Sequence, residues 1–163
     1  MNTNPRNRAK TPSQTRVTTL VVDDSPFMLK ILAQILEKTG NFDLVGTAPD
    51  GWQALRQVRA LSPELVLTDF HMPHLNGIQA TQYIKQREHS PVVIIVSSDD
   101  SPGSRSMAEK AGADGFVSKA GNLGFRLTRT LQDIFGPCAA RRAAAESISF
   151  QDGPAHSNQE HGK

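Results

Sequence analysis

The sequence predicts an α/β domain with a five-stranded parallel sheet in the order 2-1-3-4-5 and helices on both faces. Five short apolar runs alternate with stretches whose apolar residues recur at helical spacing. Such alternation is typical of a parallel sheet joined by right-handed crossovers. Acidic and polar residues follow the apolar runs, so they gather at the edge of the sheet where ligands bind in open folds of this order.

The first two strand–helix pairs occupy residues 17–61. Residues 17–22 are an apolar strand, and Ser25 followed by Pro26 suits the start of a helix, since proline is favoured at the first helical position. Gly40 suits the end of that helix. Residues 43–48 predict the second strand, and Asp50 opens a helix that stops before Pro63.

The third strand is the short apolar run that ends at Asp69. A run of this length suits a strand buried on both faces of the sheet. Pro73 cannot continue a central strand because it has no N–H to donate. Asn76 suits the cap of the helix that follows. Asp69 is therefore predicted to lie where a strand ends and a loop begins.

The last two strands are residues 91–96, the most hydrophobic run of the chain, and residues 115–118. Ser101 and Pro102 open the helix between them. A final helix is predicted to end at Gly136–Pro137. The helices are expected to bury apolar stripes that include Phe27, Trp52, Tyr83, Met107, Leu127 and Leu131.

Composition and charge divide the 163 residues into a domain at 17–136 and two tails, 1–16 and 137–163, which are predicted to be mostly disordered. The first tail is basic and has no acid, whereas the domain holds 11 basic and 13 acidic residues. This charge pattern argues against direct nucleic-acid binding. No apolar run reaches the roughly 18 residues of a membrane span. A single cysteine and no secretory signal favour a cytoplasmic location.

Five side chains at strand ends carry the predicted chemistry. They are Asp23, Asp24, Asp69, Ser97 and Lys119. Three clustered carboxylates repel one another, and a Mg²⁺ ion, which prefers oxygen ligands and a phosphate partner, relieves that repulsion. Carboxylates form acyl phosphates in phosphoryl transfer, which makes Asp69 a candidate nucleophile. Lys119 and Ser97 suit the phosphoryl oxygens.

Several short motifs resemble the receiver domain of two-component response regulators, a CheY-like fold. They are Val21-Val22-Asp23-Asp24-Ser25, Asp69-x-x-Met72-Pro73-x-x-x-Gly77, Val96-Ser97-Ser98 and Phe116-Val117-Ser118-Lys119. The resemblance spans about 17–136. Two further segments, 46–51 and 78–81, are similar to receivers of the NarL/FixJ and CheB-like subclasses.

The resemblance implies a role for each site residue. Asp69 would accept a phosphoryl group from a sensor histidine kinase or a phosphotransfer protein. The metal, Mg²⁺ or Mn²⁺, would be held by Asp23, Asp24, Asp69 and the backbone carbonyl of His71. Ser97 and Phe116 would be the switch residues, and Lys119 would bind the phosphoryl group.

The expected function is that of a single-domain response regulator rather than an enzyme, because residues 137–163 are too few for an effector domain. Its output would be a contact with an unknown downstream protein. Two alternatives stay open. One is a receiver-like scaffold that is never phosphorylated. The other is an aspartyl-phosphate phosphatase of haloacid-dehalogenase type, which needs an acid two residues after the nucleophile, where this chain has His71.

Overall fold

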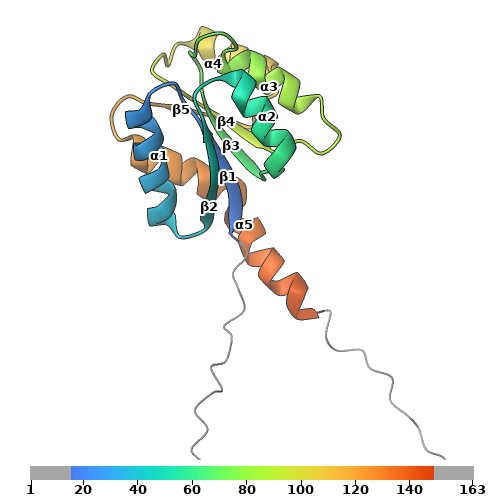
Figure 1. Ribbon diagram of the computed structural model, residues 1–163. Helices are drawn as coiled ribbons and strands as arrows, with labels where there is room; N and C mark the ends of the chain where they lie inside the picture. The colour runs from blue at the N-terminus through green and yellow to red at the C-terminus, as the bar shows by residue number, and fades with distance from the viewer. Residues whose placement is uncertain (1–15, 149–163) are drawn as a thin grey trace, which may run out of the picture.

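The protein folds into five strand–helix pairs (Figure 1). The computed structural model describes residues 16–148, with side chains to residue 136. The elements in chain order are β1 (Val17–Val22), α1 (Pro26–Thr39), β2 (Phe42–Ala48), α2 (Gly51–Leu61), β3 (Leu65–Asp69), α3 (Gly77–Lys85), β4 (Val92–Ser97), α4 (Pro102–Lys110), β5 (Gly115–Ser118) and α5 (Leu123–Ile148).

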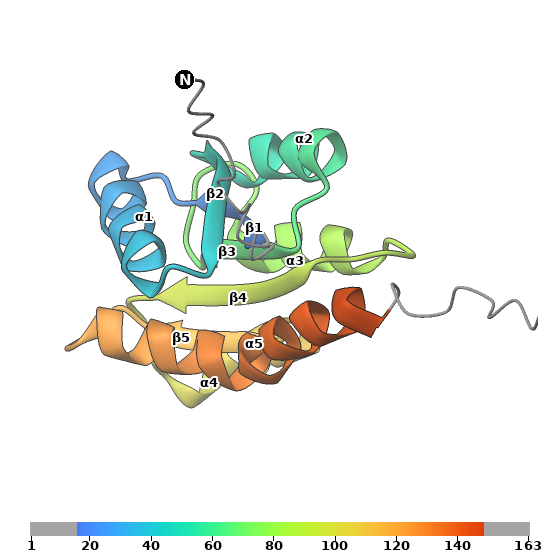
Figure 2. The same ribbon diagram turned by 90° about the horizontal axis from the view of Figure 1, so that it is seen from below.

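All strand pairs are parallel, and the sheet order is β2-β1-β3-β4-β5, which confirms the predicted fold class. Alternate strand residues face opposite sides of the sheet. Leu65 and Leu67 pack with α1 and α5, whereas Val66, between them, packs with α2 and α3. A third cluster joins α3 and α4 around Ile95. The helices thus form one layer on each face of the sheet. Figure 2 shows α1 and α2 on opposite sides of β2.

Local sequence signals set the helix ends as predicted. The Ser25 hydroxyl accepts the Met28 N–H, and Pro26 occupies the first turn of α1. Gly40 closes α1 with a φ of 73°, a left-handed conformation that glycine adopts without steric cost. Asn76 and Gln79 form a reciprocal capping box at the start of α3. Ser25 and Asn76 thus fix where α1 and α3 begin relative to the strand before each of them, and Gly40 fixes where α1 ends.

Part of the predicted apolar stripe faces solvent instead of the core. The side chains concerned are Phe27, Trp52, Tyr83 and Met107, each at least half exposed. In the short helix α4, only Ser104 and Ala108, four residues apart, turn inward. Met107 is one residue out of that row, which places it about 100° around the helix. Helical spacing alone therefore overstated the width of the buried face.

The prediction that Gly136–Pro137 ends the last helix is wrong. Helix α5 continues to Ile148, and its final turns extend past the sheet (Figure 1). Proline inside a helix loses one backbone hydrogen bond, but the alanine-rich run after it has a high helix propensity. The two predicted tails are residues 1–16 and 137–163. Most of the first and the last part of the second, residues 1–15 and 149–163, lie outside the described residues. Within residues 16–148, every helix is too short or too polar to cross a bilayer.

Candidate functional site

Three carboxylates meet at the carboxyl edge of the sheet. Asp69 is the last residue of β3, and Asp23 and Asp24 follow the neighbouring strand β1. One oxygen from each lies within 4.8 Å of the others. Asp23 and Asp69 are buried, with 1% and 6% of their surface exposed, while Asp24 faces solvent. The parallel strands thus bring Asp69 next to two residues that are 45 and 46 positions away in the sequence.

The Lys119 ammonium group lies between the two buried acids. Its Nζ is 2.6 Å from Asp69 Oδ1 and 2.8 Å from Asp23 Oδ2. The other Asp23 oxygen accepts the backbone N–H of Ser25 at 2.9 Å. Lys119 follows β5, and its own N–H donates to the Ser97 carbonyl at 2.7 Å, which anchors the lysine to the end of β4. The ends of β1, β3, β4 and β5 therefore meet at this lysine, the first two through its ammonium group and β4 through its backbone.

Burial and charge change the proton affinity of the site. Desolvation raises the pKa of Asp69 above its ordinary 3.8, and the negative charges of Asp23 and Asp24 add to that rise, while Lys119 opposes it. Burial acts to lower the pKa of Lys119, but its hydrogen bonds to Asp23 and Asp69 outweigh burial and raise it overall. The lysine stays charged, and Asp69 is held in an environment that disfavours its negative charge.

This donor set fits a divalent cation. Three carboxylates against one ammonium leave the site with excess negative charge, and the oxygens are close enough to share one ion. Oxygen ligands, with one exposed side toward water, are what Mg²⁺ prefers. A cation here would favour the ionised form of Asp69 and free Lys119 for another anion.

The predicted ligand carbonyl belongs to His71, whose exposed side chain lies beside the Phe70 ring, with centroids 4.5 Å apart.

Ser97 and Phe116 lie on the neighbouring strands. Ser97 ends β4, is fully buried, and its hydroxyl oxygen accepts the backbone N–H of Asp99 at 3.1 Å. Phe116, on β5, is partly buried against the cluster that contains Ile95 and Ala108. The Arg105 guanidinium of α4 lies over its ring, 4.7 Å from the centroid. The order of the strands predicted Ser97 at this edge, and the family resemblance implied Phe116 as its partner, but neither pointed to Arg105.

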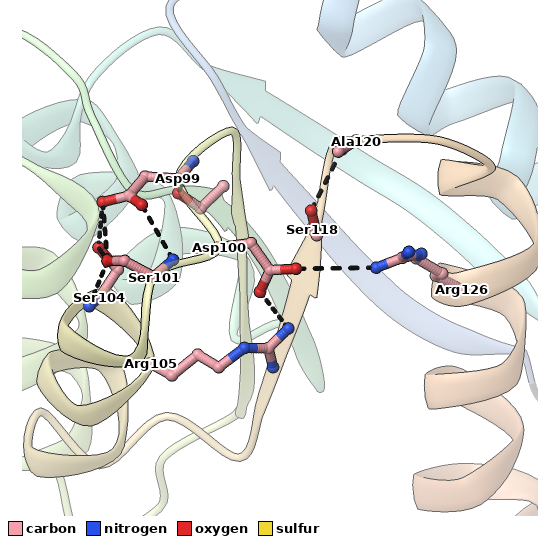
Figure 3. Close-up of polar contacts among 9 residues, drawn as sticks. Asp99, Asp100, Ser101, Ser104, Arg105, Ser118, Ala120 and Arg126 are labelled. Carbon is pink, nitrogen blue, oxygen red and sulfur yellow. Dashed lines mark hydrogen bonds and ion pairs between the residues drawn. The ribbon is translucent and has the colours of Figure 1, made fainter.

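The loop after β4 is held by its own side chains (Figure 3). The Asp99 carboxylate accepts hydrogen bonds from the Ser101 N–H and from the Ser101 and Ser104 hydroxyls. These bonds, the Ser104 hydroxyl first, lower the pKa of Asp99, and the His71 charge acts in the same direction. His71 and Asp99 therefore come from two different loops to the same edge of the sheet.

We expect Asp69→Asn to raise the melting temperature in metal-free buffer at neutral pH. Because the folded-state pKa of Asp69 is raised, its stabilising contribution is fully present below the unfolded pKa and is lost as pH rises through the folded pKa, so at neutral pH the charged group no longer stabilises the fold. A gain of about 1 kcal/mol would correspond to roughly 2–4 °C. Asp99→Asn is the matched control with the opposite sign, since the pKa of Asp99 is lowered and its carboxylate stabilises the fold above the unfolded pKa. Thermal denaturation from pH 3 to 8 measures both, and a lower melting temperature for Asp69→Asn would contradict the expectation.

Comparison with known proteins places residues 19–129 in the family described as the response regulator receiver domain. A protein-glutamate methylesterase/protein-glutamine glutaminase of Halobacterium salinarum is 31% identical over 135 residues, which cover 82% of this chain and 38% of that protein. The protein of the same name from Caldanaerobacter subterraneus is 39% identical over 108 residues, covering 65% of this chain and 29% of that protein. The chain therefore matches only about a third of the length of these relatives.

Solved structures give the same result. The receiver domain of the putative response regulator NarL from Mycobacterium tuberculosis has a TM-score of 0.68 and 29% identity, covering 77% of this chain and 97% of that chain. The response regulator domain of Thermotoga maritima CheB has a TM-score of 0.60 and 28% identity, covering 85% and 99%. Together with the observed sheet order and the acidic cluster, these matches confirm the resemblance, and the chain belongs to the response regulator receiver family of two-component signalling.

Proposed function

We propose that this receiver accepts a phosphoryl group on Asp69 and thereby changes its binding to a downstream protein. The donor is a histidine kinase or a histidine phosphotransfer protein. An Asp69 oxygen attacks the phosphorus, the phosphorus–nitrogen bond to the donor histidine breaks, and an acyl phosphate forms on Asp69. The observation that carries the proposal is the position of Asp69, buried beside two acids and within 2.6 Å of the Lys119 ammonium.

Each neighbour of Asp69 has a part in the proposed transfer. Transition-state charge in phosphoryl transfer lies on the phosphoryl oxygens, so catalysis is mainly positioning and charge neutralisation. Lys119 would move from the Asp69 carboxylate to a phosphoryl oxygen, and the Ser97 hydroxyl would donate to another. Asp23, Asp24, Asp69 and the His71 carbonyl would hold Mg²⁺ or Mn²⁺, which supplies positive charge to the carboxylate and the incoming group.

A structural relative supports the choice of metal. The CheX–CheY complex of Borrelia burgdorferi contains beryllofluoride and Mg²⁺, and its matched chain has a TM-score of 0.67 with 26% identity, covering 73% of this chain and 89% of that chain. Beryllofluoride on a carboxylate has the tetrahedral shape and charge of a phosphoryl group. We propose that the same two ligands bind the Asp69 edge of this receiver.

Incubation with acetyl phosphate and Mg²⁺ is expected to add one phosphoryl group, at Asp69. Intact-protein mass spectrometry measures the adduct, and peptide mapping after borohydride reduction locates it. Asp69→Asn should abolish the adduct, whereas the exposed Asp43→Asn, at the start of β2 and so at the opposite end of the parallel strands, should leave it unchanged. An adduct that persists in Asp69→Asn would disprove the assignment of the acceptor.

Ser97→Ala is expected to accept phosphate but to respond weakly to it. A hydrogen bond from Ser97 to a charged phosphoryl oxygen contributes roughly 1.5–3 kcal/mol, which shifts a two-state equilibrium by about ten- to a hundredfold. The measurement is the change in backbone amide chemical shifts of α4 after phosphorylation, with Ser98→Ala as the control because Ser98 is exposed. A full shift change in Ser97→Ala would exclude this hydroxyl as the switch.

A further inference from the structure

The Arg105 guanidinium contacts two parts of the receiver that sequence reasoning did not connect. It lies over the Phe116 ring at 4.7 Å from the centroid, well inside the roughly 6 Å range of a cation–π interaction. It also forms an ion pair with Asp100, in the loop between β4 and α4. Phe116 itself is only partly buried, so the guanidinium covers a ring that the core does not fully enclose.

Asp100 links this arginine to the last helix. Its second carboxylate oxygen is 3.8 Å from Arg126 Nη1, on α5, so Asp100 lies between two arginines (Figure 3). The loop that carries Asp100 is tied to Ser97 through the bond between the Ser97 hydroxyl and the Asp99 N–H. The Asp99 carboxylate also holds Ser101 and Ser104. Asp100 therefore follows a residue that Ser97 holds on one side and the start of α4 holds on the other.

We propose that Arg105 is a positioning residue that holds the Phe116 ring in place and, through Asp100, couples this ring to the loop after Ser97. The inference rests on the proposed function, because it gives Arg105 a part in the response to phosphate. The Arg105–Phe116 and Arg105–Asp100 contacts are both made while the Ser97 hydroxyl accepts the Asp99 N–H, the arrangement that precedes its turn toward a phosphoryl oxygen. Arg105 thus stabilises the phosphate-free state and opposes the switch.

The direction of the effect follows from where the contacts are made. When Ser97 turns toward a phosphoryl oxygen, the bond from the Asp99 N–H to its hydroxyl is lost, which loosens the backbone that leads to Asp100, and the ion pairs of Asp100 to Arg105 and Arg126 are weakened. Contacts that exist in one state only shift the equilibrium toward that state. The planar guanidinium stacks on a ring and pairs with a carboxylate at the same time, which a lysine ammonium does less well.

The first test needs no phosphoryl group. In the parent protein, the Phe116 ring should shift the Arg105 δ-methylene protons upfield by its ring current, and Phe116→Leu should remove that shift. Arg105→Gln should in turn broaden the χ1 distribution of Phe116, measured by side-chain scalar couplings. Arg105→Lys should restore part of the narrow distribution. Unchanged Phe116 couplings in Arg105→Gln would overturn the positioning role.

The second test measures the switch, by titrating beryllofluoride in the presence of Mg²⁺ and following the amide signals of β5. Arg105→Gln should lower the half-saturating concentration about three- to tenfold, equivalent to about 0.7–1.4 kcal/mol. Arg105→Lys should give a smaller effect, and Arg129→Gln, an exposed arginine on α5, should give none. In a Phe116→Leu background most of the Arg105→Gln effect should disappear, because the two side chains act together.

The outcomes separate this inference from the function on which it rests. A parent protein that does not respond to beryllofluoride would overturn the proposed function. A parent that responds, with Arg105→Gln responding at the same concentration or a higher one, would overturn only the role of Arg105. An Arg105→Gln effect of equal size with and without the Phe116 ring would also overturn it, since the arginine would then act by another route.

Discussion

Lys119→Met is expected to lower the free energy of unfolding by about 3–5 kcal/mol in metal-free buffer, the typical cost of removing one partner from a buried ion pair. Lys119 is the cation that contacts both buried acids, at 2.6 and 2.8 Å. Methionine has a similar shape but no charge, so Asp23 and Asp69 would face each other and Asp24 without a counter-charge. Because whole domains are stable by only about 5–15 kcal/mol, this is a large fraction of the total.

Urea denaturation measures the loss, with Lys110→Met as the matched control because Lys110 is an exposed lysine on α4. Adding Asp69→Asn to Lys119→Met should restore much of the stability, since one of the unpaired charges is then gone. Mg²⁺ should restore part of it by binding the three acids, by RT ln(1 + [Mg²⁺]/Kd), about 1.4 kcal/mol at ten times Kd. A Lys119→Met protein as stable as Lys110→Met would show that the buried acids need no counter-charge.

Local signals carried most of the fold prediction. Ser25, Gly40 and Asn76 define helix ends through hydrogen bonds to neighbours within four residues, so the sequence contains all the information that these caps need. The site was predicted for a related reason. A parallel sheet fixes where each strand ends, so the order of the strands is sufficient to predict that Asp69 and Lys119 lie at one edge.

The contacts that sequence reasoning missed depend on how helices are rotated against the sheet. Arg105 covers Phe116 because α4 presents that face to β5, and no local motif encodes this rotation. The prediction that Met107 faces inward is wrong for the same reason: the sequence does not show how α4 is rotated. Its neighbour Ala108 is buried, whereas Met107 is exposed. Helix α5 is longer than predicted. Proline usually ends a helix, which predicted an end at Gly136–Pro137, but the residues after it have a high helix propensity and continue the helix.

Gly77, the last residue of the motif that begins at Asp69, has a steric role in the structure. A Cβ at this position would lie 1.9 Å from the Asp69 carbonyl oxygen and 2.9 Å from the carbonyl carbon. The Gly77 N–H also donates to the Phe70 carbonyl at 3.2 Å. The first turn of α3 therefore packs directly on the backbone of the proposed phosphoacceptor, and only glycine allows the two segments to approach this closely.

Gly77→Ala is expected to lower the free energy of unfolding by about 2 kcal/mol or more. Alanine in a helix is more favourable than glycine by up to about 1 kcal/mol. Overpacking usually lowers the free energy of unfolding by about 1–3 kcal/mol, and a methyl group forced against backbone atoms is expected to reach or exceed the upper end of that range. Gly103→Ala is the matched control, because Gly103 lies in the first turn of α4 and its nearest neighbour would be 3.8 Å away, so the same substitution should stabilise by about 0.5–1 kcal/mol. Urea denaturation compares the two, and phosphorylation by acetyl phosphate should slow in Gly77→Ala alone, since relief of the clash moves the Asp69 backbone. Equal stability gains in both variants would show that the segment between β3 and α3 adjusts without strain.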